Sequence, residues 1–272
     1  MSNLGRKLLD KPYALWAVLF VLAPLCMVVY YAFTDTGGAF SLHSVSQIPS
    51  YLSTILLSVL YGLAATVICL LLGYPFAYLI SKHAARRQRT VVLLVMLPMW
   101  MNFLIRTYSW MTILGDSGVI NSFLTAVGLE PAKLINTGGA VILGMVYNFL
   151  PYMILPIYSV LSKLDGSLIE AAEDLGSSRH QVFRRVVLPM SLPGVLSGIT
   201  MVFVPAVSTF IISRMLGGGA NLLIGDLIEL QFLGNSYNLN LGSAMSLVLM
   251  VIVLLCMSFT SSFDEEEMEG VM

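Results

Sequence analysis

Long uninterrupted runs of apolar residues dominate this sequence of 272 residues. Between the charged positions there is room for six stretches of about 20 or more apolar residues, the length a helix needs to cross the hydrocarbon core of a membrane. The runs are continuously apolar rather than alternating, which favours helices and excludes a transmembrane β-barrel. The predicted spans cover residues 13–33, 51–80, 90–113, 139–161, 190–212 and 241–263.

The composition supports this prediction. Apolar residues make up 57% of the chain and charged residues 11%, and the mean hydropathy is +0.86. A soluble domain carries about 25% charged residues, so this chain cannot cover itself with a water-facing surface. Its 14 basic residues form no basic domain, which argues against nucleic-acid binding. The fold class predicted is therefore an all-α integral membrane protein, with residues 1–272 forming a single transmembrane domain.

The basic residues predict how the spans face. Most of them precede span one, or lie between spans two and three or between spans four and five, and short basic loops stay in the cytoplasm. These residues are Arg6, Lys7, Lys11, Lys82, Arg86, Arg87, Arg89, Lys163, Arg179, Arg184 and Arg185. Both termini, including the acidic tail 264–269, are then cytoplasmic. The first apolar run exceeds the 7–15 residues usual for a cleavable signal peptide, so we interpret it as an uncleaved anchor.

The connection between spans four and five, residues 165–189, differs from the other loops. Ser167 followed by Glu170 predicts a capping box at the start of a short helix. Gly176 stands where a left-handed residue would end that helix. The segment therefore begins as a capped helix with a defined stop rather than as a solvated loop.

A second short helix is predicted directly afterwards. Ser178 and Gln181 form another potential capping box, and Leu188-Pro189 is expected to close the helix. The product is a rigid hairpin at the cytoplasmic surface, suited to docking into a groove of a partner protein. Its expected docking face contains Leu168, Ala171, Ala172 and Leu175. An ordinary amphipathic hairpin at the membrane interface is the alternative.

The same loop resembles the EAA signature of permease subunits of ATP-binding-cassette (ABC) importers. Both the spacing of its residues and its place between the fourth and fifth of six spans are similar to that family. The matching positions are Glu170, Ala171, Ala172, Gly176, Val186, Leu188 and Pro189. The resemblance implies that these residues couple the permease to an ATPase.

Three further strings resemble the spermidine/putrescine branch of this family. They are Leu-Gly-Tyr-Pro-Phe-Ala at 72–77, Pro-Met-Trp-Met-Asn-Phe-Leu-Ile-Arg-Thr-Tyr at 98–108, and Gly-Gly-Gly-Ala-Asn-Leu-Leu-Ile-Gly at 217–225. The resemblance implies a permease for polyamines, which a binding protein delivers. Branches that transport iron, molybdate or other small solutes share parts of these strings and remain alternatives.

The resemblance also implies an assembly in the bacterial cytoplasmic membrane. The chain would form one half of a heterodimeric pore with a second homologous permease subunit, two ATPase subunits and a soluble substrate-binding protein. The sequence contains no Gly-x-x-x-x-Gly-Lys-Ser/Thr string. ATP with Mg²⁺ is therefore expected on the partner ATPases, and this chain is expected to bind no cofactor or metal and to catalyse no reaction itself.

Candidate residues for the substrate path combine aromatic faces, one amide and two carboxylates, because a polycation binds to aromatic rings and carboxylates. They are Trp100, Asn102, Tyr108, Tyr147, Asp226 and Glu229. The carboxylates follow Gly217-Gly-Gly on the predicted outer side and have the alternative of simply facing solvent. Arg106 is expected to extend to the outer surface or to pair with an acidic neighbour.

Two other classes of protein remain as alternatives. A secondary transporter would need charged groups inside the spans and two similar halves, and the spans contain no Asp or Glu at mid-membrane depth. An intramembrane enzyme would need a nucleophile with a base, or paired His or Asp residues, within the spans. Neither pattern is present, so an ATP-driven importer is favoured.

Overall fold

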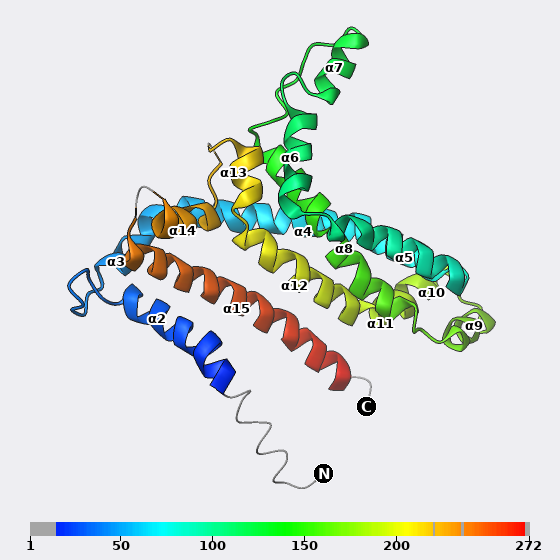
Figure 1. Cartoon of the computed structure of the whole chain (residues 1–272). Helices are drawn as coiled ribbons and strands as arrows, with labels where there is room; N and C mark the ends of the chain where they lie inside the picture. Colours follow the sequence, from blue (N-terminus) through cyan, green and yellow to red (C-terminus); the bar gives the residue numbers. More distant parts are fainter. Residues whose placement is uncertain (1–14, 220, 235–236, 270–272) are drawn as a thin grey trace. The chain divides into compact units, whose positions relative to one another are not determined.

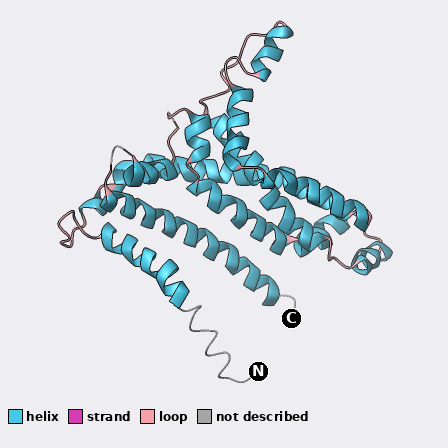
Figure 2. Cartoon of the chain, viewed as in Figure 1, coloured by secondary structure: helices cyan, strands magenta, loops and turns pink. Residues whose placement is uncertain are grey.

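The computed structural model describes the backbone of residues 15–219, 221–234 and 237–269, with side chains as far as residue 260. The chain divides into two compact units. The first comprises Met1–Ser53 with Leu227–Ile252, and the second comprises Thr54–Asp226 with Val253–Met272. The described part is helical and contains no sheet (Figure 2). Its one strand-like feature is an isolated antiparallel bridge between Thr34 and Phe40.

Figure 1 labels the α-helices. In the first unit and at its boundaries the bounds are Val18–Leu22 (η1), Ala23–Ala32 (α2), His43–Ser46 (α3), Ile48–Tyr51 (η2), Ile224–Leu233 (α14) and Leu239–Glu269 (α15). In the second unit they are Leu52–Ser81 (α4), Ala85–Trp100 (α5), Phe103–Leu114 (α6), Val119–Ala126 (α7), Gly138–Leu161 (α8), Gly166–Asp174 (α9), Arg179–Val182 (α10), Phe183–Val187 (η3), Leu188–Met190 (α11), Leu192–Ser208 (α12) and Ile211–Gly217 (α13). Helices α4, α14 and α15 each continue across a unit boundary.

The described helices are long and apolar enough for four membrane spans, or six if each of two bent helix pairs counts as one. The four are Leu15–Ala32, His43–Ser81, Gly138–Leu161 and Leu239–Thr260. They agree with the predicted first, second, fourth and sixth spans, although the first predicted span begins outside the described residues. The all-helical fold class is confirmed.

The third predicted span is not the continuous helix expected over 90–113. Helix α5 and the segment Phe103–Ala126, which begins with α6, meet at an angle of 87° after a break at Met101 and Asn102. The Asn102 side chain accepts hydrogen bonds from the N–H groups of Leu104 (2.9 Å) and Ile105 (3.4 Å). It thereby caps a new helix, because an Asn side chain can replace the carbonyl of the preceding turn.

The fifth predicted span, 190–212, is also divided. Helix α12 ends at Ser208, Thr209 is extended, and α13 starts at Ile211. At its other end α12 bends by 59° from the helical segment Arg179–Met190. The apolar pattern ran through both breaks and therefore did not reveal them.

A widened turn precedes each of two helical prolines. The N–H of Ala23 donates to the carbonyl of Val18, and the N–H of Leu188 donates to the carbonyl of Phe183, five residues back instead of four. Proline follows immediately in both places, at Pro24 and Pro189. The wider turn relieves the clash between the proline ring and the carbonyl four residues earlier. We predicted that the hairpin helix closes at Leu188-Pro189, but it continues to Met190. The wide turn allows the helix to pass through Pro189.

In the first unit, an asparagine joins the end of α2 to the start of α15. The Asn240 side-chain amide donates to the carbonyls of Tyr31 (2.9 Å) and Thr34 (2.7 Å). Asn240 and Thr34 are both buried. The first bond reaches a carbonyl in the last turn of α2, where the helix leaves carbonyls open, and the second reaches one just beyond the end of the helix.

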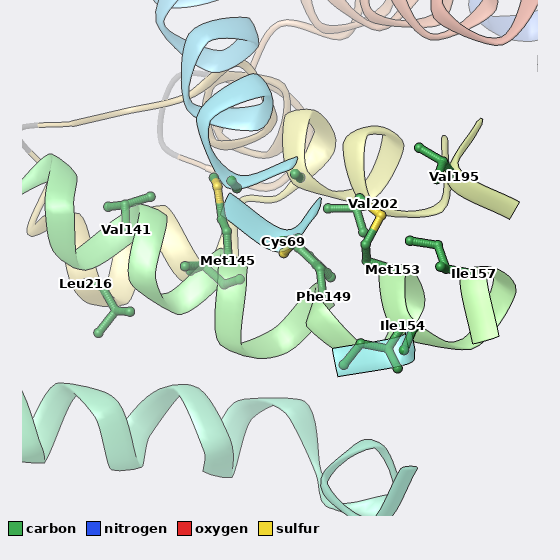
Figure 3. Packing of buried hydrophobic residues seen from close by; sticks show 14 of the residues in the cluster. Cys69, Val141, Met145, Phe149, Met153, Ile154, Ile157, Val195, Val202 and Leu216 are labelled. Carbon is green, nitrogen blue, oxygen red and sulfur yellow. The ribbon is translucent and has the colours of Figure 1, made fainter. Parts of the chain in front are cut away.

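The core of the second unit lies between α8 and α12. Met145, Met153 and Ile157 of α8 face Val195 and Val202 of α12, with Cys69 of α4 beside them (Figure 3). The two helices approach closely at a glycine of α12. A Cβ atom at Gly194 would stand 2.9 Å from the carbonyl oxygen of Pro156 and 3.1 Å from the Cα of Ile157.

We predict that Gly194→Ala destabilises the protein by about 1–3 kcal/mol, because the added methyl group meets backbone atoms of α8 that cannot move independently. The measurement is the free energy of unfolding in detergent. Gly139→Ala is the control, because a Cβ atom there is 3.8 Å from its nearest neighbour, the Thr137 Oγ1 atom. Equal stability of the two variants would contradict the proposed close packing.

Candidate coupling hairpin and translocation path

Helix α9 ends in a glycine-centred cap. Gly176 has φ of +82°, its N–H donates to the carbonyl of Glu173 (2.9 Å), and the N–H of Ser177 donates to the carbonyl of Ala172 (3.1 Å). This pair of bonds is the Schellman arrangement, which requires a left-handed residue. The prediction that Gly176 forms a left-handed corner is confirmed.

The start of α9 differs from the prediction. The N-cap is Asp165, whose Oδ1 accepts a hydrogen bond from the N–H of Ser167 at 3.0 Å. This bond and one from the Ser167 hydroxyl lower the pKa of the Asp165 carboxyl, so the ionised cap persists to lower pH. The predicted capping box of Ser167 with Glu170 was wrong, because the helix begins earlier and Asp165 takes the capping position. Glu170 lies further along the helix with its side chain exposed.

The second capping box is confirmed. The N–H of Ser178 donates to Gln181 Oε1 (2.8 Å), and the N–H of Gln181 donates to Ser178 Oγ (3.4 Å). From this cap a helical segment continues through α10, η3 and α11 to Met190. Two capped helices joined at Gly176 thus make up the hairpin, as the sequence indicated.

The hairpin has an outer and an inner face. Leu168 and Ala171 are exposed, and Leu175 is 87% exposed. Ile169 and Ala172 pack against the buried core instead. Ala172 therefore contributes less to the expected docking face than the other three residues. Of the remaining signature positions, Leu188 is exposed and Val186 and Pro189 are half-buried.

Three aromatic rings attach the hairpin to α4. The ring of Phe183 makes edge contacts with Tyr74 (6.0 Å between centroids) and with Tyr78 (5.3 Å). The hydroxyl of Tyr74 lies 2.8 Å from the Oγ of Ser191, the residue between α11 and α12. Sequence reasoning missed this attachment, although Tyr74 lies inside one of the strings that resemble the permease branch.

Beside these ring contacts, a cavity of about 320 Å³ lies between the end of α4 and both hairpin helices. Its lining residues are Tyr78, Lys82, Ile169, Glu173, Arg179, Val182, Phe183 and Val187. Phe183 thus both lines this cavity and contacts α4 through Tyr74 and Tyr78.

The aromatic candidates for the substrate path occupy different environments. Trp100 is 73% exposed at the end of α5, and Tyr108 is exposed on α6. Tyr147 is half-buried, with its ring 5.4 Å from the ring of Trp110 in an edge contact. Asn102 is exposed, but its side-chain oxygen is used as the cap of α6.

The two carboxylate candidates also differ. Asp226 is fully buried, and its Oδ2 accepts a hydrogen bond from the N–H of Leu223 at 2.8 Å. This bond caps the start of α14, which gives Asp226 a structural use. Glu229 is half-buried on the same helix beyond the unit boundary.

Arg106 behaves differently from the prediction. Its side chain is only 8% exposed, and its Nε and Nη1 atoms have no hydrogen-bond partner among the residues that the structure describes. The guanidinium carbon lies 5.9 Å from the centroid of the Phe103 ring. The expectation that Arg106 extends to the surface or pairs with an acidic neighbour within the described chain was wrong.

Comparison with known proteins defines the class. Residues 12–264 match the family described as "Binding-protein-dependent transport system inner membrane component". The chain belongs to this family, and it is therefore a multi-pass inner-membrane permease of a binding-protein-dependent ABC importer, a transport subunit rather than an enzyme.

Two relatives are permeases of spermidine/putrescine transport systems. The spermidine/putrescine transport system permease protein PotB of Haemophilus influenzae is 39% identical over 250 residues, covering 88% of this chain and 87% of the relative. PotB of Escherichia coli K12 is 38% identical over 248 residues, covering 88% and 90%. A solved bacterial ABC transporter that imports alginate contains a chain with TM-score 0.79 at 17% identity, over 96% of this chain and 97% of that one. The last comparison shows a shared fold.

We predict that Gly176→Ala destabilises the hairpin by about 1–2 kcal/mol, because an L-residue resists the left-handed conformation. Amide hydrogen exchange over residues 171–177 should become faster. Gly166→Ala is the matched control, since open space surrounds both glycines and only Gly176 has positive φ. Unchanged exchange in Gly176→Ala would show that the corner does not depend on glycine.

Proposed function

We propose that this chain is one of two permease subunits of an ATP-driven importer for polyamines such as spermidine and putrescine. The observation that supports this cargo is the 38–39% identity to PotB proteins over 88% of the chain. The strings at 72–77, 98–108 and 217–225 resemble the same branch. Permeases for iron, molybdate or another small solute remain the alternative.

The proposed assembly contains this chain as a single transmembrane domain, a second homologous permease, two ATPase subunits and a soluble binding protein. ATP with Mg²⁺ binds to the ATPases. The basic residues of the even-numbered connections support an orientation with both termini in the cytoplasm. The hairpin 165–189 then faces the side on which ATP is available.

We assign the hairpin the role of docking on an ATPase subunit. Its exposed residues Leu168, Ala171 and Leu175 offer an apolar knob, with Glu170 beside it for a polar contact. The two caps and the Gly176 corner hold that knob rigidly. A rigid element transmits displacement, so motion of the ATPase would move Phe183 against Tyr74 and Tyr78, and thereby tilt α4 relative to α12.

The proposed substrate path uses the exposed aromatic rings of Trp100 and Tyr108, with Asn102 at the corner between them. Aromatic faces attract ammonium groups, and their flat surfaces contact the methylene chain of a polyamine. Tyr147 and Glu229 are retained as candidates. Asp226 is better explained by its capping bond to α14, so its loss would act on folding first.

The experiment that tests the proposal is uptake of radiolabelled spermidine and putrescine in cells that lack this chain, with and without the chain restored. The other components of the transporter are present, and molybdate and ferric iron serve as control substrates. We expect polyamine uptake to return with the chain. If a control substrate is taken up instead, the chain is still a permease, but polyamines are not its cargo.

A second arm of this experiment tests the energy source. When ATP is depleted while the ion gradients are held, an ABC importer loses accumulation of its substrate. Persistent accumulation under these conditions would favour a secondary transporter.

We predict that Phe183→Ala uncouples the transporter. The ATPase should still be recovered with the chain, because Leu168, Ala171 and Leu175 are unchanged, but uptake should fall by about tenfold or more as the contact with α4 is lost. Uptake and ATPase recovery are measured in parallel. Phe123→Ala, at an exposed phenylalanine of α7, is the control. Normal uptake in Phe183→Ala would reject this route of coupling.

A further inference from the structure

The cavity between α4 and the hairpin is lined by charges of both signs, and the proposed docking on an ATPase uses none of them. Lys82 directly follows α4, and Arg179 is the first residue of α10. Glu173 lines the same cavity from α9. Among the described residues, no ion pair involves any of the three. Two cations and one carboxylate therefore border a shared volume of about 320 Å³ without neutralising one another.

This charged lining lies on the inner side of the hairpin. Glu173 is one helical turn after Ile169, whose side chain packs against the buried core, whereas Leu175 is 87% exposed. The Nζ atom of Lys82 lies 5.2 Å from the centroid of the Tyr78 ring, which also lines the cavity. This contact holds the ammonium group beside the cavity. A protein docked on the outer face of the hairpin would therefore not fill it.

The cavity lies at the level where lipid headgroups meet the protein. The candidate membrane span that contains α4 ends at Ser81, and Lys82 is the next residue. Headgroups begin where the hydrocarbon core ends, and basic pockets between helices at this level bind the headgroups of phospholipids. The rest of the lining is apolar or aromatic and suits the glycerol and first methylene groups of a lipid. It consists of Tyr78, Ile169, Val182, Phe183 and Val187.

The three charges together define the headgroup. A phosphate diester accepts charge-assisted hydrogen bonds from Lys and Arg side chains. A carboxylate next to them repels a headgroup that is only anionic, but it accepts hydrogen bonds from a primary ammonium group. Phosphoethanolamine contains both groups. The cavity volume is at the lower end of the range for small-ligand sites, which suits a headgroup rather than a whole lipid.

We infer that this cavity binds the phosphoethanolamine headgroup of a membrane phospholipid, with the phosphate held by Lys82 and Arg179 and the ammonium group held by Glu173. The bound headgroup connects the end of α4 to both hairpin helices, beside the ring contacts of Phe183. This site goes beyond the proposed function and is independent of the cargo, because lipid binding is measured without uptake. A failure of polyamine uptake would leave it standing.

The first test measures binding of phosphatidylethanolamine to the full transporter by native mass spectrometry, after purification in mild detergent. Lys82→Met combined with Arg179→Met removes both cations from the lining. We expect the dissociation constant to rise by about tenfold or more, because two charge-assisted contacts to the phosphate are lost.

The matched control is Lys163→Met combined with Arg185→Met. It removes the same charge at exposed positions of the same cytoplasmic connection, and neither residue lines the cavity. Its dissociation constant should equal that of the wild type. Wild-type binding in the Lys82→Met and Arg179→Met variant, or an equal loss in the control, would overturn the inference.

A second arm tests Glu173 through the choice of headgroup. The wild type should bind phosphatidylethanolamine about threefold or more tightly than phosphatidylglycerol with the same acyl chains, because only the former offers an ammonium group. Glu173→Gln should abolish this preference. Asp174→Asn, at a neighbouring exposed position outside the lining, should keep it. Equal binding of the two lipids by the wild type, or a preference that survives Glu173→Gln, would overturn the assignment.

A third measurement uses only the wild-type transporter and separates a lipid from a soluble ligand of the same chemistry. Amide hydrogen exchange over residues 179–187 is compared between nanodiscs of phosphatidylcholine and nanodiscs that also contain phosphatidylethanolamine. We expect slower exchange with phosphatidylethanolamine, because its headgroup connects the hairpin to α4. Inorganic phosphate or soluble phosphoethanolamine, added to the phosphatidylcholine nanodiscs, should not slow exchange. Protection by either soluble compound, or no protection by the lipid, would overturn the inference.

Discussion

Satisfaction of backbone hydrogen bonds inside an apolar environment is the constraint on which the rest of this structure depends. Hydrocarbon offers no partner to an open N–H or C=O group, so every interruption of a helix needs a substitute within the chain. Asn102 supplies one where α5 ends and α6 begins, and Asn240 supplies another at the end of α2. Before Pro24 and Pro189 the helix widens by one residue instead of stopping. Such substitutes accompany some of the breaks, whereas Ser191 before α12 and Phe210 before α13 make no side-chain capping bond.

The hairpin shows how the same local chemistry would serve the proposed contact with an ATPase. Its two helices are too short to be stable alone, yet caps at Asp165 and Ser178 and the left-handed Gly176 satisfy their ends without help from a partner. The outward leucines thus remain exposed on a preformed surface. In the proposed docking little conformational entropy would be lost, because the hairpin is already ordered. The ring of Phe183 contacts Tyr74 and Tyr78 of α4 beside one cavity.

The sequence predicted the features that depend on residues close to one another in the chain. Span positions followed from apolar length, the corner at Gly176 followed from the need for a left-handed residue, and the capping box of Ser178 and Gln181 followed from their spacing. Features decided by competition or by tertiary contact were missed. Asp165 and Ser167 can each cap a helix, and the sequence does not show where the chain turns. The break at Asn102 lies in a run that is as apolar as an unbroken helix. Among the candidate path residues, the burial of Asp226 depends on the packing of α14, which no spacing reveals.

The buried polar side chains divide into two kinds, according to whether their polar atoms have hydrogen-bond partners within the described residues. Asn121 donates to the carbonyls of Gly115 and Ala132 and accepts from the N–H of Ala132, so its amide is satisfied by its own loop. Asn240 is satisfied in the same way. Arg106 Nε and Nη1, and the Oδ1 atom of Asn148, lack partners among the described residues. Both side chains are buried in the second unit, Arg106 at 8% exposure and Asn148 at 1%. Burial removes water as a partner, so these atoms carry a cost of desolvation that no hydrogen bond within the described residues offsets.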